Sequence, residues 1–134
     1  VPISQYYHQD LKSWIGKLLS RPQIEILLSR QTPPISDVVS DIWQSTVFAD
    51  LLDSDGNPFL PGPSHEGRLI FGLSVDGFNP FWNKTAKQSV SSTCIWLVLL
   101  NLPPNLRYLP ENIFLVGIIP GPNKPSTDEI NHAM

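Results

Sequence analysis

Asp76 is the residue whose type and position best suit chemistry. It ends the alternating segment Arg68 to Asp76, in which Leu69, Phe71, Leu73 and Val75 face one way and Ile70, Gly72, Ser74 and Asp76 face the other. This two-residue period is typical of a β-strand and puts Asp76 on the face opposite the apolar side chains. Gly77 follows and permits close approach of a ligand. A carboxylate at a strand end is a good ligand for a hard metal ion, although an Asp-Gly turn explains the same residues.

Other arrangements with catalytic or metal-binding potential fit their patterns less well. Asp53-Ser-Asp-Gly-Asn57 resembles the start of a calcium loop, but its Gly is fourth where the EF-hand requires it sixth. We therefore predict a plain turn. Gly72 to Gly77 misses the spacing of a hydrolase nucleophile elbow by one residue. The single cysteine, Cys94, lies in an apolar run, so we predict a buried and inert thiol.

Composition and charge limit the class of protein. The chain has 134 residues, which fits about one domain, and 41% of them are hydrophobic. Nine Lys and Arg against twelve Asp and Glu give a formal charge of −3 and form no basic run. We therefore expect the chain alone to bind DNA weakly, because phosphate contacts depend on cations. The sequence has no signal-peptide pattern and no membrane-length apolar run, so we expect an intracellular protein without a membrane partner.

The first part of the chain, residues 1–52, is expected to be helical. Apolar residues between Leu11 and Leu19 follow the spacing of one helix face, and Ile24 to Leu28 form a short second helix. Ser36 is expected to cap a third helix that buries Val39, Ile42 and Trp43, and the apolar spacing is compatible with its extension toward Leu52. We also assign Trp14, Trp43 and Trp96 to packing.

A turn-rich loop over residues 53–67 separates this segment from residues 68–134, where strands are expected. The strand over Arg68 to Asp76 is followed by an apolar one from Thr93 to Leu102, expected to be central and covered on both faces. A third spans Asn112 to Ile119, and Ser126 or Thr127 caps a helix in which the sequence ends. The predicted fold is α+β: three antiparallel strands preceded by a helical segment and truncated after the start of the following helix.

Several blocks of sequence resemble the fungal branch of the CACTA (En/Spm) transposases. The most specific block is Val-Asp-Gly-Phe-Asn-Pro-Phe at 75–81. The others are Leu-Leu-Asn-Leu-Pro-Pro at 99–104, Gly-Ile-Ile-Pro-Gly-Pro-Asn-Lys-Pro-Ser at 117–126, and the upstream Leu-Lys-Ser-Trp-Ile-Gly at 11–16 and Asp-Ile-Trp at 41–43. The resemblance extends over essentially the whole chain.

This resemblance implies that residues 68–134 are the first part of a ribonuclease H-like catalytic domain of the DDE/DDD type, which cleaves and joins DNA. Asp76 would be its first catalytic acid and a ligand for Mg²⁺ or Mn²⁺. Two further acids would lie beyond Met134, so the chain by itself is expected to be inactive. In a full-length relative, Lys84, Lys87 and Arg107 could contact DNA phosphates; the alternative is ordinary solvated surface, which is usual for Lys and Arg. The resemblance also implies a nuclear location and is compatible with a homo-oligomer.

A non-catalytic alternative starts from the same residues. The chain holds one of the three expected catalytic acids, has more Asp and Glu than Lys and Arg, and carries Trp82 close to Asp76 in sequence. These features would suit a transposon-derived remnant that acts as a protein-interaction module. Either way, a three-stranded sheet without later strands has an exposed edge and an uncovered face, so we expect marginal stability or aggregation.

Overall fold

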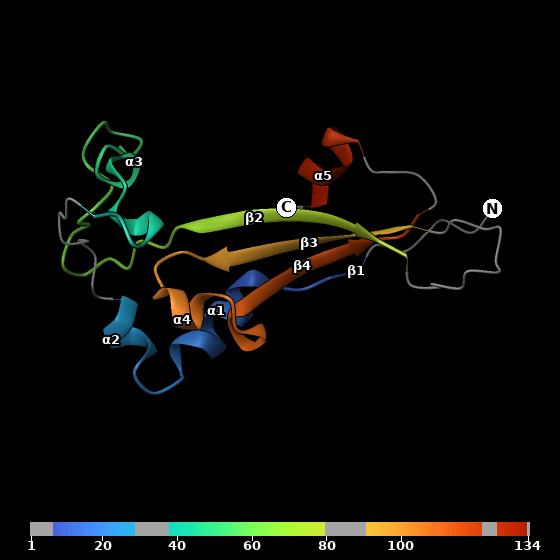
Figure 1. Ribbon diagram of the computed structural model, residues 1–134, viewed down its shortest axis with the longest axis horizontal. Helices are drawn as coiled ribbons and strands as arrows, with labels where there is room; N and C mark the ends of the chain where they lie inside the picture. The colour runs from blue at the N-terminus through green and yellow to red at the C-terminus, as the bar shows by residue number, and fades with distance from the viewer. Residues whose placement is uncertain (1–6, 29–37, 80–90, 122–125, 134) are drawn as a thin grey trace.

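A computed structural model describes residues 7–28, 38–79, 91–121 and 126–133. Its centre is an antiparallel sheet of four strands in the order β1-β4-β3-β2 (Figure 1). The strands are β1 (Tyr7–His8), β2 (Phe71–Phe78), β3 (Ser92–Leu99) and β4 (Ile113–Ile119). The α+β class and the three predicted strands are confirmed. The strand number is corrected to four, because the two residues of β1 are too few to show alternation in the sequence.

The two faces of the sheet differ in what packs on them. Directly opposed residues of antiparallel strands share a face, and the register pairs Phe71 with Leu99 and Asp76 with Cys94. The covered face carries Ile95 and Leu99, which are fully buried. The open face carries Asp76, Cys94 and Trp96. A bulge in β4 at Val116 adds one more buried side chain to the covered face.

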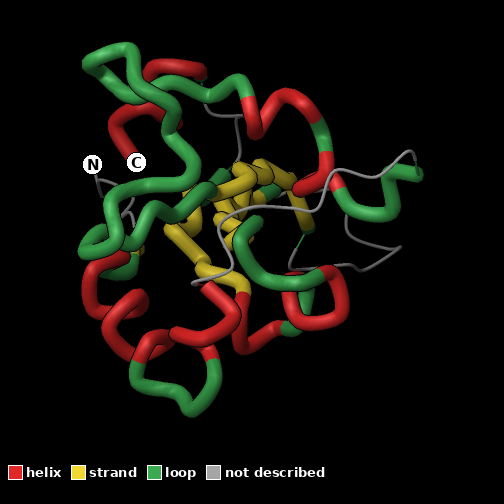
Figure 2. Tube along the Cα trace, turned by 90° about the vertical axis from the view of Figure 1, so that its left-hand side faces the viewer, coloured by secondary structure: helices red, strands yellow, loops and turns green. Residues whose placement is uncertain are grey.

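Helices α1 (Leu11–Leu19), α2 (Ile24–Leu28) and α5 (Thr127–Ala133) pack against the covered face. One buried cluster joins helix and sheet residues: Leu18, Ile24, Leu28, Leu99 and Leu102. A second is formed by Ile95, Phe114 and Val116, with Leu11, Trp14 and Ile130 against it. Figure 2, which views the strands nearly end-on, shows the helices around the sheet. The helical segment and the sheet therefore share one core.

The burial of β3 corrects the prediction that this strand is covered on both faces. The strand is interior, as expected, and Ile95 and Leu99 on its covered face and Cys94 on its open face are buried. Trp96 and Val98 on the open face are half-buried. The apolar run thus reflects an interior strand with one deeply buried face, and the second face is partly accessible.

The predicted third helix is broken into two short pieces. A 3₁₀ turn, η1 (Ile42–Gln44), is capped by Asp41, and α3 (Thr46–Ala49) is capped by Ser45. The Ser45 hydroxyl accepts a hydrogen bond from the Val47 N–H at 3.3 Å. Such local bonds compete with a continuous helix. Trp43 is buried as expected, but Val39 and Ile42 are exposed. The predicted cap, Ser36, lies outside the described residues.

The loop that follows contains the predicted turn. The Asp53 carboxylate accepts hydrogen bonds from the N–H groups of Asp55 and Asn57, at 3.0 and 2.9 Å. Gly56 has a φ of +79°, a conformation that glycine adopts without strain. Arg68 forms an ion pair with Asp53 at 3.5 Å. In the part of the chain that the structure describes, no helix is long and apolar enough to cross a membrane.

Candidate functional site

Asp76 lies in the edge strand of the described sheet, with its side chain exposed on the open face. The strand continues to Phe78, so Asp76 lies two residues inside the strand and does not end it. Its placement opposite the covered apolar face agrees with the sequence pattern. Its carboxylate makes no hydrogen bond or ion pair with any other described side chain. Both carboxylate oxygens are therefore accessible to a ligand.

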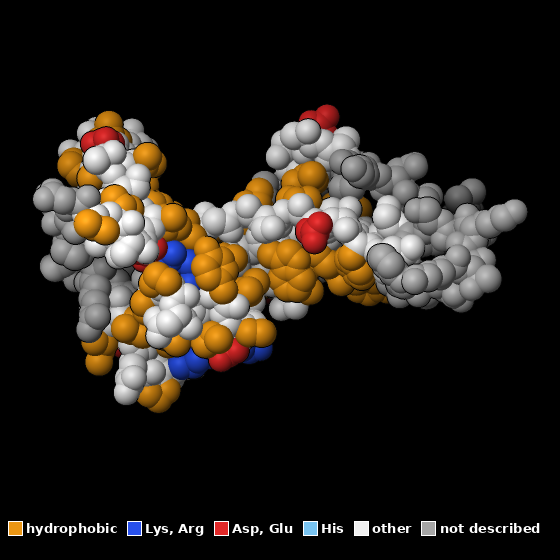
Figure 3. Space-filling model, viewed as in Figure 1, with side chains coloured by type: hydrophobic (Ala, Val, Ile, Leu, Met, Phe, Trp, Pro, Cys, Tyr) orange, Lys and Arg blue, Asp and Glu red, His pale blue; other side chains and the backbone are white. Residues whose placement is uncertain are grey.

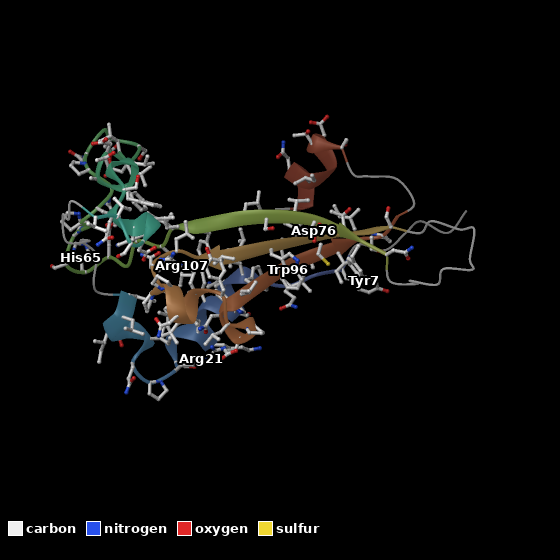
Figure 4. All side chains as sticks on the ribbon, in the orientation of Figure 1. Tyr7, Arg21, His65, Asp76, Trp96 and Arg107 are labelled. Carbon is white, nitrogen blue, oxygen red and sulfur yellow. The ribbon has the colours of Figure 1, made fainter. Side chains whose placement is uncertain are left out.

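The neighbours of Asp76 on the open face are aromatic, sulfur-containing and hydroxyl side chains: Phe78, Trp96, Cys94, Ser74 and Ser92. Cys94 lies directly opposite, and Trp96 is the diagonal cross-strand neighbour, because it pairs with Ser74. Figure 4 shows Asp76 and Trp96 along the same stretch of the sheet, and Figure 3 shows an acidic side chain among hydrophobic ones on this face. Burial raises the pKa of the Cys94 thiol, and the Asp76 charge raises it further. The predicted buried thiol is confirmed, with 7% of the residue exposed.

The described residues do not form a metal centre by themselves. Among them, no group of three or more His, Cys, Asp or Glu side chains is arranged to hold a metal ion. Mg²⁺ requires six oxygen ligands in near-octahedral geometry, and one carboxylate leaves most of them to water. Asp76 is thus suited to be one ligand of a divalent cation, and the described part of the chain supplies no complete site.

The position of Arg107 contradicts the expectation that this residue contacts DNA phosphates. Only 3% of this residue is exposed. Its Nη1 and Nη2 donate to the two carboxylate oxygens of Asp41 at 2.8 and 2.9 Å, and Nε donates to the Leu102 carbonyl at 3.0 Å. Hydrogen bonding from Arg107 is the main reason why the pKa of Asp41 lies below its ordinary value. Arg107 therefore joins the helical segment to the sheet. Lys84 and Lys87 lie outside the described residues, as does Trp82.

Sequence reasoning missed the aromatic residues beside Asp76. The sequence pattern assigns Trp96 to packing and gives no role to Phe78. The signal that would find them is the pairing register of β2 and β3, since Trp96 is a diagonal neighbour of Asp76 only if Asp76 is opposite Cys94. A one-residue slip would move Trp96 to the other face.

Comparison with known families identifies the class to which this sheet and its acid belong. A family model described as "Transposase family tnp2" matches residues 59–131, more than half of the chain. The matched segment contains β2, β3, β4 and Asp76, so the protein is of transposase origin. The chain belongs to the transposase family tnp2. Comparisons with curated proteins and with solved structures find no match.

Proposed function

We propose that this chain is part of the catalytic domain of a DDE-type DNA transposase and that Asp76 is one of the acids that bind its metal ions. One observation carries the proposal. Within the segment that matches the family, Asp76 presents an exposed carboxylate without a described partner on the open face of the sheet. Structural carboxylates of this chain, such as Asp41, are instead bound to cations or backbone N–H groups.

The fold that we propose for this domain is ribonuclease H-like. Three antiparallel strands that are consecutive in the chain lie side by side as β4-β3-β2, and helix α5 follows β4. This order supports the proposal, since such a domain begins with three antiparallel strands and then a helix. The blocks of sequence around Asp76 further favour the fungal CACTA branch of the family. A nuclear location and DNA as the partner follow from the same proposal.

The metal ions in this proposal are Mg²⁺ or Mn²⁺. When bound in such an enzyme, they activate the attacking oxygen and stabilise the leaving one. This chain contributes the Asp76 carboxylate, fixed in position by its hydrogen-bonded neighbour β3. We propose that the other ligands come from sequence outside the described residues, because those residues form no group of three or more His, Cys, Asp or Glu that could hold a metal ion.

The test is DNA nicking by a chain that extends this sequence beyond Met134. Mg²⁺- or Mn²⁺-dependent nicking of a transposon-end substrate is expected, and Asp76→Asn should reduce it at least about a hundredfold. Asp55→Asn is the matched control, since Asp55 is exposed in the turn of the 53–67 loop. Unchanged nicking by Asp76→Asn would remove Asp76 from the catalytic site.

A second candidate function is a protein-interaction module derived from a transposase. It is favoured by the formal charge of −3 and by the half-buried apolar side chains of the open face. The same experiment separates the two functions. Absence of metal-dependent nicking in every extended chain that folds would favour the interaction module.

A further inference from the structure

Two aromatic side chains, Phe78 and Trp96, flank Asp76 on the open face, which also carries Ser74 and Ser92 beside it. Phe78 is two residues further along β2 on the same side and is 42% exposed. Trp96 is half-buried on the neighbouring strand, about 7–8 Å from Asp76 as a diagonal cross-strand neighbour. On the far side of the sheet, Tyr7 pairs with Ile118, which pairs with Cys94 (Figure 4). One row of the open face thus leads from Asp76 across the sheet to an exposed tyrosine.

Cations are absent from this surface in the described part of the chain. None of the described Lys and Arg residues lies in a strand; they are Lys12, Lys17, Arg21, Arg68 and Arg107. Figure 3 shows hydrophobic side chains over the strands and the basic ones toward the helices at one end. Phosphate contacts require Lys, Arg or backbone donors. The described open face therefore offers aromatic surface next to a carboxylate, and no charge that attracts a phosphate.

Aromatic surface is what an unpaired nucleobase recognises. Bases in a duplex are hidden in the stack, whereas bases of a single strand stack on aromatic side chains with little dependence on sequence. We propose that Trp96 and Phe78 form a stacking platform for unpaired bases of the DNA strand that approaches Asp76. This inference rests on the proposed function, which brings DNA to Asp76, and it adds the form of DNA that the site accepts.

The platform has two measurable consequences. Stacking on one aromatic side chain changes affinity by about fivefold or more for each base. Binding that depends on stacking also releases few counterions, so its affinity should fall by less than about tenfold between 50 and 200 mM salt, unlike binding through many phosphates. Removing the negative charge of Asp76 should leave this binding unchanged or strengthen it.

The experiment measures binding of this chain to a fluorescein-labelled oligothymidylate of about twelve nucleotides by anisotropy, at both salt concentrations. Trp96→Leu and Phe78→Leu should each weaken binding at least about fivefold. Trp96→Phe retains an aromatic ring and should stay within about threefold of the unchanged chain. Phe48→Leu is the control, because Phe48 packs on Trp43 away from the sheet. A duplex of the same length should bind more weakly than the single strand.

Three results would overturn the platform: no oligothymidylate binding up to millimolar protein, equal binding by the Trp96→Leu and Phe78→Leu double variant, or a salt dependence as steep as that of phosphate binding. Circular dichroism of each variant verifies its fold, and Trp96→Phe tests stacking if Trp96→Leu unfolds. Asp76→Asn separates the two proposals. If Asp76→Asn loses nicking and retains oligothymidylate binding, both the catalytic role of Asp76 and the stacking platform are supported. If Asp76→Asn retains nicking while binding still depends on Trp96, only the catalytic role of Asp76 is contradicted.

Discussion

Two aspartates of this chain show how the surroundings of a carboxylate indicate its role. Asp41 receives two hydrogen bonds from the Arg107 guanidinium, at 2.8 and 2.9 Å, and caps a 3₁₀ turn. Asp76 receives none from the described side chains and faces solvent beside Trp96. A carboxylate whose acceptor capacity is already used stabilises the fold, and one whose oxygens remain accessible is suited to a ligand. The hydrogen-bond partners of each carboxylate therefore distinguish structural acids from the candidate functional one.

Arg107→Met should destabilise the fold by about 2–4 kcal/mol. The substitution leaves Asp41 without its partner and the carbonyls of Leu100 and Leu102 without a donor. Urea unfolding followed by circular dichroism measures this change. Lys12→Met is the control, because Lys12 is exposed on α1, and its effect should stay within about 0.5 kcal/mol. Equal stability of the two variants would contradict the structural role of Arg107.

The Asp41–Arg107 pair also predicts a pH dependence of stability. The folded-state pKa of Asp41 lies below its ordinary value of 3.8. Its contribution is therefore fully present above pH 3.8 and is lost as the pH falls through the lower folded-state value. Asp41→Asn should be clearly less stable than the unchanged chain at pH 7, and the difference should narrow at pH 3 and below. A difference that is constant between pH 7 and pH 2 would exclude the pair as its cause.

At the scale of elements, the pattern of apolar residues, periodic in α1 and β2 and continuous in β3, was sufficient to predict α1, α2 and all three long strands. Local patterns carried that information, and Phe71, Ile95 and Leu99 lie on the covered face that packs on the helices. The prediction of one helix over 36–52 was wrong because it relied on apolar spacing and did not consider two capping residues, Asp41 and Ser45, that interrupt the helix. The pairing of Asp41 with Arg107 could not be predicted, since 66 residues separate them and neither position shows a local pattern.

An interior strand and the edge strand β2 should respond differently to the same substitution on the covered face. Leu99→Ala removes a fully buried side chain that contacts α1 and α2, and it should cost about 2–5 kcal/mol. Leu73→Ala changes a residue of β2 that is 48% exposed, and it should cost less than about 1 kcal/mol. Chemical denaturation of both variants measures the difference. Similar costs would mean that Leu73 is also buried, contrary to its exposure in β2.

At the scale of the whole molecule, the described chain is a sheet whose covered face packs against α1, α2 and α5. The described residues place no strand beyond β2, and Leu73 and Val75 in it are exposed. An exposed apolar edge strand is a site of self-association. Membership of the tnp2 transposase family is shown by residues 59–131, and the site within it could be anticipated from the block that contains Asp76. Its aromatic surroundings depended on strand register, which the sequence does not specify.

Val75→Lys should reduce self-association of the chain. A charge on an edge strand discourages pairing with a second copy, and the position is exposed enough to accept it. The fraction of monomer at a given concentration should rise in size-exclusion chromatography with light scattering. Val47→Lys is the matched control, since Val47 is exposed on α3 away from the sheet. An equal effect of both variants would attribute the change to net charge alone.

The claim that Asp76 binds a metal ion is tested most directly by changing the ligand atom. In a chain extended beyond Met134, Asp76→Cys replaces a carboxylate oxygen with a thiolate, which Mg²⁺ accepts poorly and Mn²⁺ accepts better. Nicking should be lost with Mg²⁺ and should return with Mn²⁺ to at least about a tenth of the unchanged activity, while Asp76→Ser stays inactive with both. Equal nicking by Asp76→Cys and the unchanged chain in Mg²⁺ would contradict the account.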